Sequence, residues 1–255
     1  MTTASERFDG LARNYAISEV HSQSPSLDRL RSLLPRVESV CDVASGAGHS
    51  GLSYAGIAQR IVAVDPAPHM LAQVRQLAAE RNVAVETIQA FAESIPLPTG
   101  TFDLVVCRLA AHHFSDVAAG VREMVGIARP GGYVAVIDLV GEGTPELDNL
   151  IHTIEVLHDP THVRSYTAPQ WRQWFDDFGL NIVTCEPRCR EVPAGLTIER
   201  WCELGGSGTA ATQEINRLLA AAPADHLTHL EISRDADGRF RLPVHTILIV
   251  GQKPA

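Results

Sequence analysis

A glycine-rich stretch near residue 45 holds the residue types most suggestive of ligand chemistry. It runs Val40-Cys41-Asp42-Val43-Ala44-Ser45-Gly46-Ala47-Gly48-His49-Ser50-Gly51. An apolar run, typical of a buried strand, ends in small residues, and a helical pattern follows it. Gly46 and Gly48 permit a sharp turn and let a ligand approach the backbone closely. The stretch therefore predicts a strand that turns into a helix beneath a bound ligand.

A carboxylate follows this turn at the distance expected of a ribose-binding residue. Asp65 lies 19 residues after Gly46 and ends the apolar run of residues 60–64. A carboxylate in that position can accept hydrogen bonds from both hydroxyls of an adenosine ribose. NAD and S-adenosylmethionine satisfy this pattern equally well.

Two observations favour S-adenosylmethionine over NAD. A Tyr-x-x-x-Lys pair, which would suit hydride transfer, is absent because the single lysine of the chain is Lys253. Asp42 stands immediately before the turn, where a carboxylate would repel a pyrophosphate and attract the ammonium group of a methionyl cofactor. The alternative for Asp42 is purely local bonding to backbone N–H groups of the turn.

The elements that must position these residues alternate between strands and helices. Strands are expected over 38–44, 60–65, 83–90, 101–109, 133–139, 180–185, 229–233 and 242–250. Helices are expected over 6–34, 49–59, 68–81, 115–128 with Ser115 as N-cap, 145–158, 168–178 and 197–221, the last interrupted at 205–208. This rhythm predicts a parallel, doubly wound sheet, in which ligands lie outside the carboxyl ends of the strands. A turn at 235–238 should join the last two strands as a hairpin.

Composition narrows the function class. The 255-residue chain carries a net charge of -9, which argues against a nucleic-acid-binding surface. No apolar run is long enough for a membrane helix, and the first residues lack the pattern of a secretory signal. A cytoplasmic protein is therefore expected. The five cysteines have no C-x-x-C spacing, and no His, Cys and carboxylate set has the usual ligand spacing, so no metal is expected.

Several blocks together resemble the class I S-adenosylmethionine-dependent methyltransferases, especially the bacterial group related to ubiquinone- and menaquinone-biosynthesis C-methyltransferases. The blocks are Asp42-Val43-Ala44-Ser45-Gly46-Ala47-Gly48, Val64-Asp65-Pro66 with Met70, Ala92-Glu93-Ser94-Ile95-Pro96, Phe102-Asp103-Leu104-Val105 with Ala111-His112-His113-Phe114, Arg129-Pro130-Gly131-Gly132, and Phe8-Asp9 with Ala12 and Tyr15. Their order and spacing match the family, most closely over residues 38–139. The family usually has a polar residue where this chain has Phe91.

The resemblance implies one Rossmann-like domain over 1–255 with seven strands in the order 3-2-1-4-5-7-6, the last antiparallel, and a helical lid made of 1–35, 141–165 and 193–225. It implies S-adenosylmethionine as cofactor and a small-molecule methyl acceptor. The cofactor would be held by Asp42, Ala44, Ser45, Gly46, Gly48, Asp65, Pro66, Met70, Ala92, Glu93 and Arg108. The oligomeric state stays open.

The second half of the reaction is expected around two adjacent histidines. His112 and His113 follow the fourth strand, where family members meet their substrate, and a histidine can act as a base near neutral pH. We expect His113 to be the base if the acceptor must lose a proton. Candidate substrate contacts are Tyr15, Ser18 and His21, which recur at helical spacing, and His158.

Two alternatives to methyl transfer remain at this point. One is a protein of this fold that binds the cofactor but catalyses another reaction or regulates. The other is an NAD(P)-dependent oxidoreductase. The cluster Trp171, Trp174, Phe175 and Phe178 is interpreted as core rather than as an aromatic substrate box.

Overall fold

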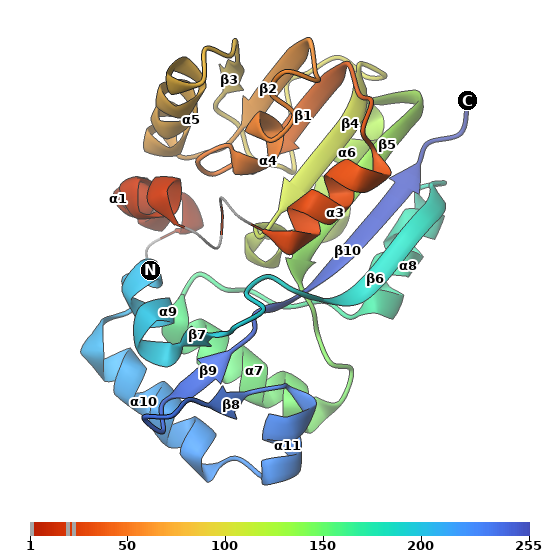
Figure 1. Cartoon of the computed structure of the whole chain (residues 1–255). Helices are drawn as coiled ribbons and strands as arrows, with labels where there is room; N and C mark the ends of the chain where they lie inside the picture. The colour runs from red at the N-terminus through yellow and green to blue at the C-terminus, as the bar shows by residue number, and fades with distance from the viewer. Residues whose placement is uncertain (1–2, 19–20, 22–23) are drawn as a thin grey trace.

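The computed structural model describes residues 3–18, 21 and 24–255. Its main sheet has seven strands, which are β1 (Ser39–Val43), β2 (Arg60–Val64), β3 (Glu86–Ile88), β4 (Phe102–Arg108), β5 (Ala128–Leu139), β6 (Asn181–Arg190) and β10 (His245–Gln252). Their order is β3-β2-β1-β4-β5-β10-β6 (Figure 1). Strand β10 runs antiparallel to both β5 and β6, and the pairings among β1 to β5 are parallel. The predicted order and the antiparallel last strand are confirmed.

Helices cover both faces of the sheet. On one face α3 (Pro25–Leu33) packs against β5, β10 and β6, and α5 (Pro68–Glu80) packs beside β2 and β3. On the other face lie α6 (Val117–Ile127) and α8 (Ala168–Asp177). Trp171 and Phe175 of α8 are fully buried there, and Trp174 and Phe178 are partly buried. The interpretation of this aromatic cluster as core is confirmed.

A smaller cluster lies beyond the carboxyl end of β5. It contains α7 (Pro145–His158), α9 (Ile198–Gly205), α10 (Gly208–Ala221), α11 (Ala224–His229) and a second sheet of β7 (Leu196–Thr197), β9 (Phe240–Leu242) and β8 (Ser233–Arg234). Their apolar side chains form a core of their own. The amino-terminal helix α1 (Ala4–Ile17) lies between α5 and this cluster (Figure 1). The predicted lid segments 141–165 and 193–225 lie here together with α1, whereas α3, which also belongs to the predicted segment 1–35, packs on the main sheet. Residues 1–2, 19–20 and 22–23 of that segment lie outside the described residues.

Some expected boundaries were wrong in the amino-terminal half. The helix over 6–34 is not continuous in the described residues: α1 ends at Ile17, and α3 begins anew at Pro25, with Ser24 as its N-cap. Helix α4 (His49–Leu52) ends well before residue 59. Strand β5 begins at Ala128, earlier than the expected residue 133.

The carboxyl-terminal hairpin also differs from the prediction. The turn at 235–238 joins β8 to β9, because Pro243 and Val244, which has a φ of 53°, separate β9 from β10. Of residues 229–233 only Ser233 belongs to a strand, β8, since α11 extends to His229. Leu230 and Ile232 instead bury their side chains in the smaller core.

Helix α6 is capped by Asp116 rather than by the expected Ser115. The Asp116 carboxylate accepts a hydrogen bond from the Ala119 amide at 3.0 Å, whereas Ser115 donates its hydroxyl to Glu93. We expect Asp116→Ala to lower the free energy of unfolding by about 1 kcal/mol, the usual contribution of an N-cap. Urea unfolding measures the change. A larger loss in Ser115→Ala would contradict the assignment of the cap.

None of the helices in the described part of the chain is long and apolar enough to cross a membrane.

Candidate active site

The glycine turn leaves β1 through three residues with positive φ. Ala44 has a φ of 50°, Gly46 of 52° and Gly48 of 82°. A Cβ atom on Gly48 would lie 2.9 Å from Val74 of α5, so glycine is required there for packing. A Cβ atom on Gly46 would meet nothing within 4 Å. Gly46 therefore faces open space, as a position beneath a ligand should.

Two buried carboxylates fix this turn. Asp65 accepts hydrogen bonds from the amides of Gly46 and Ala67, both at 2.8 Å, and Asp42 accepts one from the Gly51 amide at 2.7 Å. Burial raises the pKa of Asp65 to about 6 and that of Asp42 to about 7, although these hydrogen bonds act in the opposite direction. The hydrogen bond of Asp42 to the Gly51 amide is thus the local backbone bonding that the sequence analysis gave as the alternative role of this residue.

A cavity of about 290 Å³ opens above the turn. Nine of the residues expected at the cofactor line it: Ala44, Ser45, Gly46, Asp65, Pro66, Met70, Ala92, Glu93 and Arg108. Asp42 and Gly48 are not among its lining residues and act on its shape through the turn. The carboxylate of Glu93 accepts hydrogen bonds from the amide and hydroxyl of Ser115, which ties the 92–93 segment to the start of α6.

Several lining residues were not anticipated as contacts. They are Thr3, Ala4, Ser5 and Phe8 of the amino-terminal segment, and Ala47, His49, Ser50, Ala67, Phe91, Leu109, Ala110, Phe114 and Ser115. Phe91 is 62% exposed, which is unusual for a phenylalanine. A ligand that stacks on its ring would cover this exposed surface. The departure from the family pattern at Phe91 was the one sequence signal that could have marked it.

Arg108 joins the cavity to the amino-terminal segment. Its side chain donates to the Ser50 hydroxyl at 3.2 Å and to the His21 carbonyl at 2.5 Å. Burial lowers the pKa of Arg108, against the attraction of Glu191 and Asp42.

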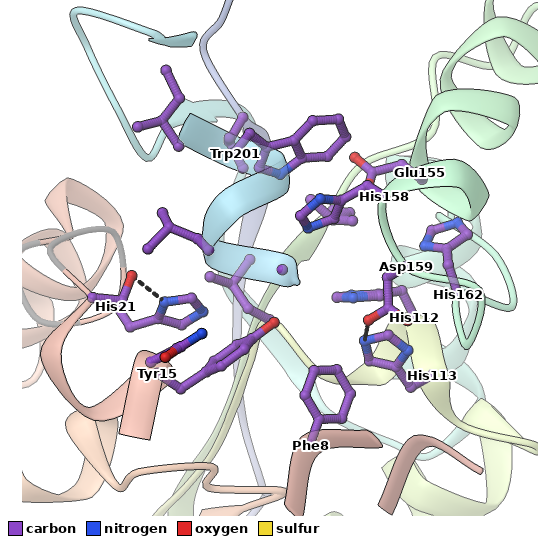
Figure 2. Close-up of a pocket in the computed structure, with 18 residues that line it drawn as sticks. Phe8, Tyr15, His21, His112, His113, Glu155, His158, Asp159, His162 and Trp201 are labelled. Atoms are coloured by element: carbon purple, nitrogen blue, oxygen red, sulfur yellow. Dashed lines mark hydrogen bonds and ion pairs between the residues drawn. The ribbon is translucent and has the colours of Figure 1, made fainter. Parts of the chain in front are cut away.

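A second, smaller cavity of about 90 Å³ adjoins the first (Figure 2). Five residues line both cavities: Phe8, Tyr15, His21, Leu109 and His113. The other expected substrate and catalytic residues, Ser18, His112 and His158, line the smaller one. The structure therefore brings all six of these sequence-predicted residues to one place.

The two adjacent histidines have different partners. His112 directs Nδ1 to a carboxylate oxygen of Asp138 at 2.5 Å, and the other oxygen of Asp138 accepts from the His112 amide at 2.8 Å. Burial opposes protonation of His112, but Asp138 outweighs it and raises the pKa above 6.5. His113 donates from Nδ1 to the Thr161 carbonyl at 3.0 Å, and burial together with His112 lowers its pKa to about 3.

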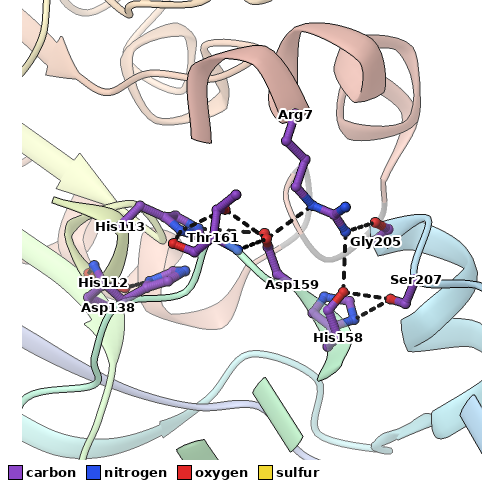
Figure 3. A network of polar contacts seen from close by, with 9 residues as sticks. All are labelled: Arg7, His112, His113, Asp138, His158, Asp159, Thr161, Gly205 and Ser207. Carbon is purple, nitrogen blue, oxygen red and sulfur yellow. Dashed lines mark hydrogen bonds and ion pairs between the residues drawn. The ribbon is translucent and has the colours of Figure 1, made fainter. Parts of the chain in front are cut away.

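Arg7 connects α1 to the far wall of the smaller cavity (Figure 3). Its guanidinium pairs with Asp159 at 3.0 Å and donates to the carbonyls of Gly205 at 2.6 Å and His158 at 3.2 Å. Asp159 in turn accepts from the amide and hydroxyl of Thr161, which holds His113. One arginine thus couples the amino-terminal helix to the loop behind the histidines.

We expect Arg7→Ala to loosen α1 and to raise the dissociation constant for S-adenosylmethionine by about tenfold, because each hydrogen bond from a charged group contributes about 1.5–3 kcal/mol. Arg13→Ala is the matched control, since Arg13 is exposed on the same helix. Calorimetry measures the affinity and limited proteolysis measures the release of α1. Equal effects of the two variants would contradict the assigned coupling.

Comparison with known proteins identifies the family to which this chain belongs. A model of the methyltransferase domain matches residues 41–136. The uncharacterised methyltransferase YcgJ of Bacillus subtilis is 36% identical over 137 residues, which are 53% of this chain and 54% of that protein. The malonyl-[acyl-carrier protein] O-methyltransferase of Pseudescherichia vulneris is 30% identical over 188 residues, which are 69% of this chain and 70% of that protein. The chain belongs to the class I S-adenosylmethionine-dependent methyltransferases.

The solved structure of YcgJ from Bacillus subtilis matches 90% of this chain and 98% of its own chain, with a TM-score of 0.81 and 28% identity. The sequence alignment spans about half the length of YcgJ, 54%, and other curated relatives are also covered in part. The cofactor of the family is S-adenosylmethionine, and the open Gly46 cradle and the Asp65 carboxylate fit it.

The described part of the chain contains no group of three or more histidine, cysteine and acidic side chains arranged to hold a metal ion.

Proposed function

We propose that the protein transfers the methyl group of S-adenosylmethionine to a small-molecule acceptor held in the smaller cavity. The observation that carries the proposal is the shared wall of the two cavities, made by Phe8, Tyr15, His21, Leu109 and His113. A sulfonium at this junction would face the acceptor directly. Methyl transfer mainly requires donor and acceptor to be aligned at roughly 3–3.5 Å, and two adjoining cavities supply that alignment.

In the larger cavity, we assign the ribose hydroxyls to Asp65 and the methionyl part to the turn at Gly46. Pro66 and Met70 would pack on the adenine, beside Ala92 and Glu93. Phe91, exposed at the cavity wall, would stack on the base in place of the polar residue usual in the family. Asp42 would support this arrangement by fixing the start of α4.

We assign the role of the base that deprotonates the acceptor to His112 rather than to His113. A base is most effective when its pKa lies near the working pH. The pKa of His112 is raised by Asp138, whereas that of His113 is lowered to about 3. His113 remains at the junction as a neutral group that orients the acceptor.

The lid over 1–35, 141–165 and 193–225 is part of the same proposal. Its support is that α1, α7 and α9 contribute Phe8, Tyr15, Glu155, His158 and Trp201 to the cavity walls. Movement of α1 would admit the cofactor, and its return through the Arg7 contacts would exclude water.

We also propose a cytoplasmic location. All five cysteines are free thiols, which suits a reducing compartment.

Transfer of a labelled methyl group into a cell extract tests the proposed function. We expect label in a small-molecule product, and tight binding of S-adenosylmethionine without binding of a nicotinamide cofactor. Tight binding with no labelled product from any extract would favour the alternative of a cofactor-binding protein with another reaction. Failure to bind S-adenosylmethionine would contradict the proposal altogether.

A further inference from the structure

Three histidines of the smaller cavity offer hydrogen-bond acceptors to a ligand. Nδ1 of His112 faces a carboxylate and Nδ1 of His113 faces the Thr161 carbonyl, and these groups can only accept. Both Nδ1 atoms therefore carry the hydrogen. Ser207 donates its hydroxyl to the His158 carbonyl at 2.7 Å and so accepts from Nδ1 of His158 at 3.2 Å. In their neutral forms all three rings leave Nε2 without a hydrogen.

Glu155 adds a carboxylate to this wall. It lies on α7, its residue is buried, and its side chain makes no hydrogen bond or ion pair with the described residues. Burial raises its pKa to about 7, so an ionised form is present at neutral pH. An unpaired buried carboxylate is costly unless a ligand supplies a donor or a positive charge.

The charges around the cavity do not favour an anionic ligand. Among the residues that the structure describes, no lysine or arginine lines the cavity. The guanidinium of Arg7 is committed to Asp159 and two backbone carbonyls. The negative charges of Asp138 and Asp159 offset the positive charges of Arg7 and a protonated His112. An ionised Glu155 therefore gives the site a negative net charge.

The size of the cavity limits what it can hold. Its volume of about 90 Å³ is smaller than the roughly 150 Å³ cavity that accommodates benzene. A head group of a few atoms fits better than a ring. Phe8, Tyr15, Leu109 and Trp201 supply apolar and aromatic surface beside the polar wall.

We propose that the acceptor is a small protonated amine whose ammonium group pairs with Glu155. The inference rests on the proposed methyl transfer. The nitrogen loses one proton to Nε2 of His112, whose positive charge is held by Asp138. The nitrogen lone pair then forms a bond to the methyl carbon while the carbon–sulfur bond breaks, its electron pair remaining on sulfur. The products are the N-methylated ammonium ion and S-adenosylhomocysteine, and His112 afterwards releases its proton.

The choice of an amine differs from what the name of one relative states. That relative is a malonyl-[acyl-carrier protein] O-methyltransferase. A carboxylate acceptor would need a cation that the lining of this cavity lacks. A neutral hydroxyl would satisfy the histidine nitrogens but would leave the charge of Glu155 uncompensated.

Three probes of equal chain length test the proposal: n-propylammonium, n-propanol and propionate. Their affinities for the complex with S-adenosylhomocysteine are measured by NMR titration at pH 8, so turnover is not needed. We expect n-propylammonium to bind at least about tenfold more tightly than propionate or n-propanol. Propionate binding as tightly as the amine would overturn the proposal, and equal binding of n-propanol would point to a hydroxyl acceptor.

Glu155→Gln removes the charge while keeping the size of the side chain. We expect this substitution to weaken the binding of n-propylammonium by about tenfold and to leave the affinity for n-propanol unchanged. Glu146→Gln is the control, because Glu146 is exposed on the same helix. Equal behaviour of the two variants would overturn the role of Glu155. If Glu155→Gln does not fold, the three probes on the unmodified protein still decide. Failure of S-adenosylhomocysteine itself to bind would instead contradict the proposed function.

Discussion

Replacing Gly46 with leucine is expected to weaken S-adenosylmethionine binding by at least about 100-fold, which corresponds to about 2.7 kcal/mol. The reason is steric. A Cβ atom at Gly46 points into the open space of the larger cavity, so a leucine side chain would fill the volume assigned to the methionyl part. The protein should stay folded, because no atom of the described residues lies within 4 Å of that Cβ position. Calorimetry gives the affinity and thermal unfolding gives the stability.

Gly46→Ala separates the filling of the cavity from backbone strain. Gly46 has a φ of 52°, where an L-residue costs roughly 1–2 kcal/mol. Alanine adds this strain but little volume, so we expect a loss of affinity of tenfold or less. Leucine and alanine variants that bind equally well would show that the cavity above Gly46 is not the cofactor site.

Replacing His112 with glutamine is expected to lower turnover by about 10²–10⁴-fold, the range for loss of a general base. Cofactor affinity should change little, because His112 lines only the smaller cavity. His113→Gln is the comparison, and we expect a smaller loss from it because the pKa of His113 lies far below neutral. A larger loss in His113→Gln would return the base to the residue that the sequence favoured.

The pH dependence of the methyl-transfer rate tests the role of His112 as the base independently. A base works in its unprotonated form, and the pKa of His112 is raised above 6.5. The rate should therefore rise with pH through a value above 6.5. Asp138→Asn should lower the pKa of His112 and move this rise to lower pH. Initial rates between pH 5 and 9 measure it. A rise that persists unchanged in His112→Gln would contradict the assignment.

The sheet and the glycine turn could be predicted from local sequence. Strands β1, β2 and β4 are mostly apolar runs. Asp65 follows the run of β2 at the carboxyl edge where ligands bind, so the placement of these strands needed little tertiary information. The hairpin at 235–238 was recognised from its turn residues, but the strands it joins were not. Burial of Leu230 and Ile232 in the smaller core decided the structure there.

The acceptor side could be predicted only in part. His112 and His113 were found because they follow a strand, but nothing in the sequence near Asp138, at the end of the apolar run of β5, indicates its partner. Its pairing with His112 depends on the register of β4 with β5. Glu155 carries no motif, and its burial follows from how α7 packs. The Arg7 contacts join residues more than 150 positions apart, which no local pattern reveals.

A crystal structure with S-adenosylmethionine bound would locate the methyl donor relative to the two cavities. We expect the sulfonium at the junction formed by Phe8, Tyr15, His21, Leu109 and His113. Its methyl group should point into the cavity of His112 and Glu155, and the ribose should rest on Asp65. A sulfonium away from this junction, or a methyl group facing solvent with the smaller cavity closed to it, would contradict the account.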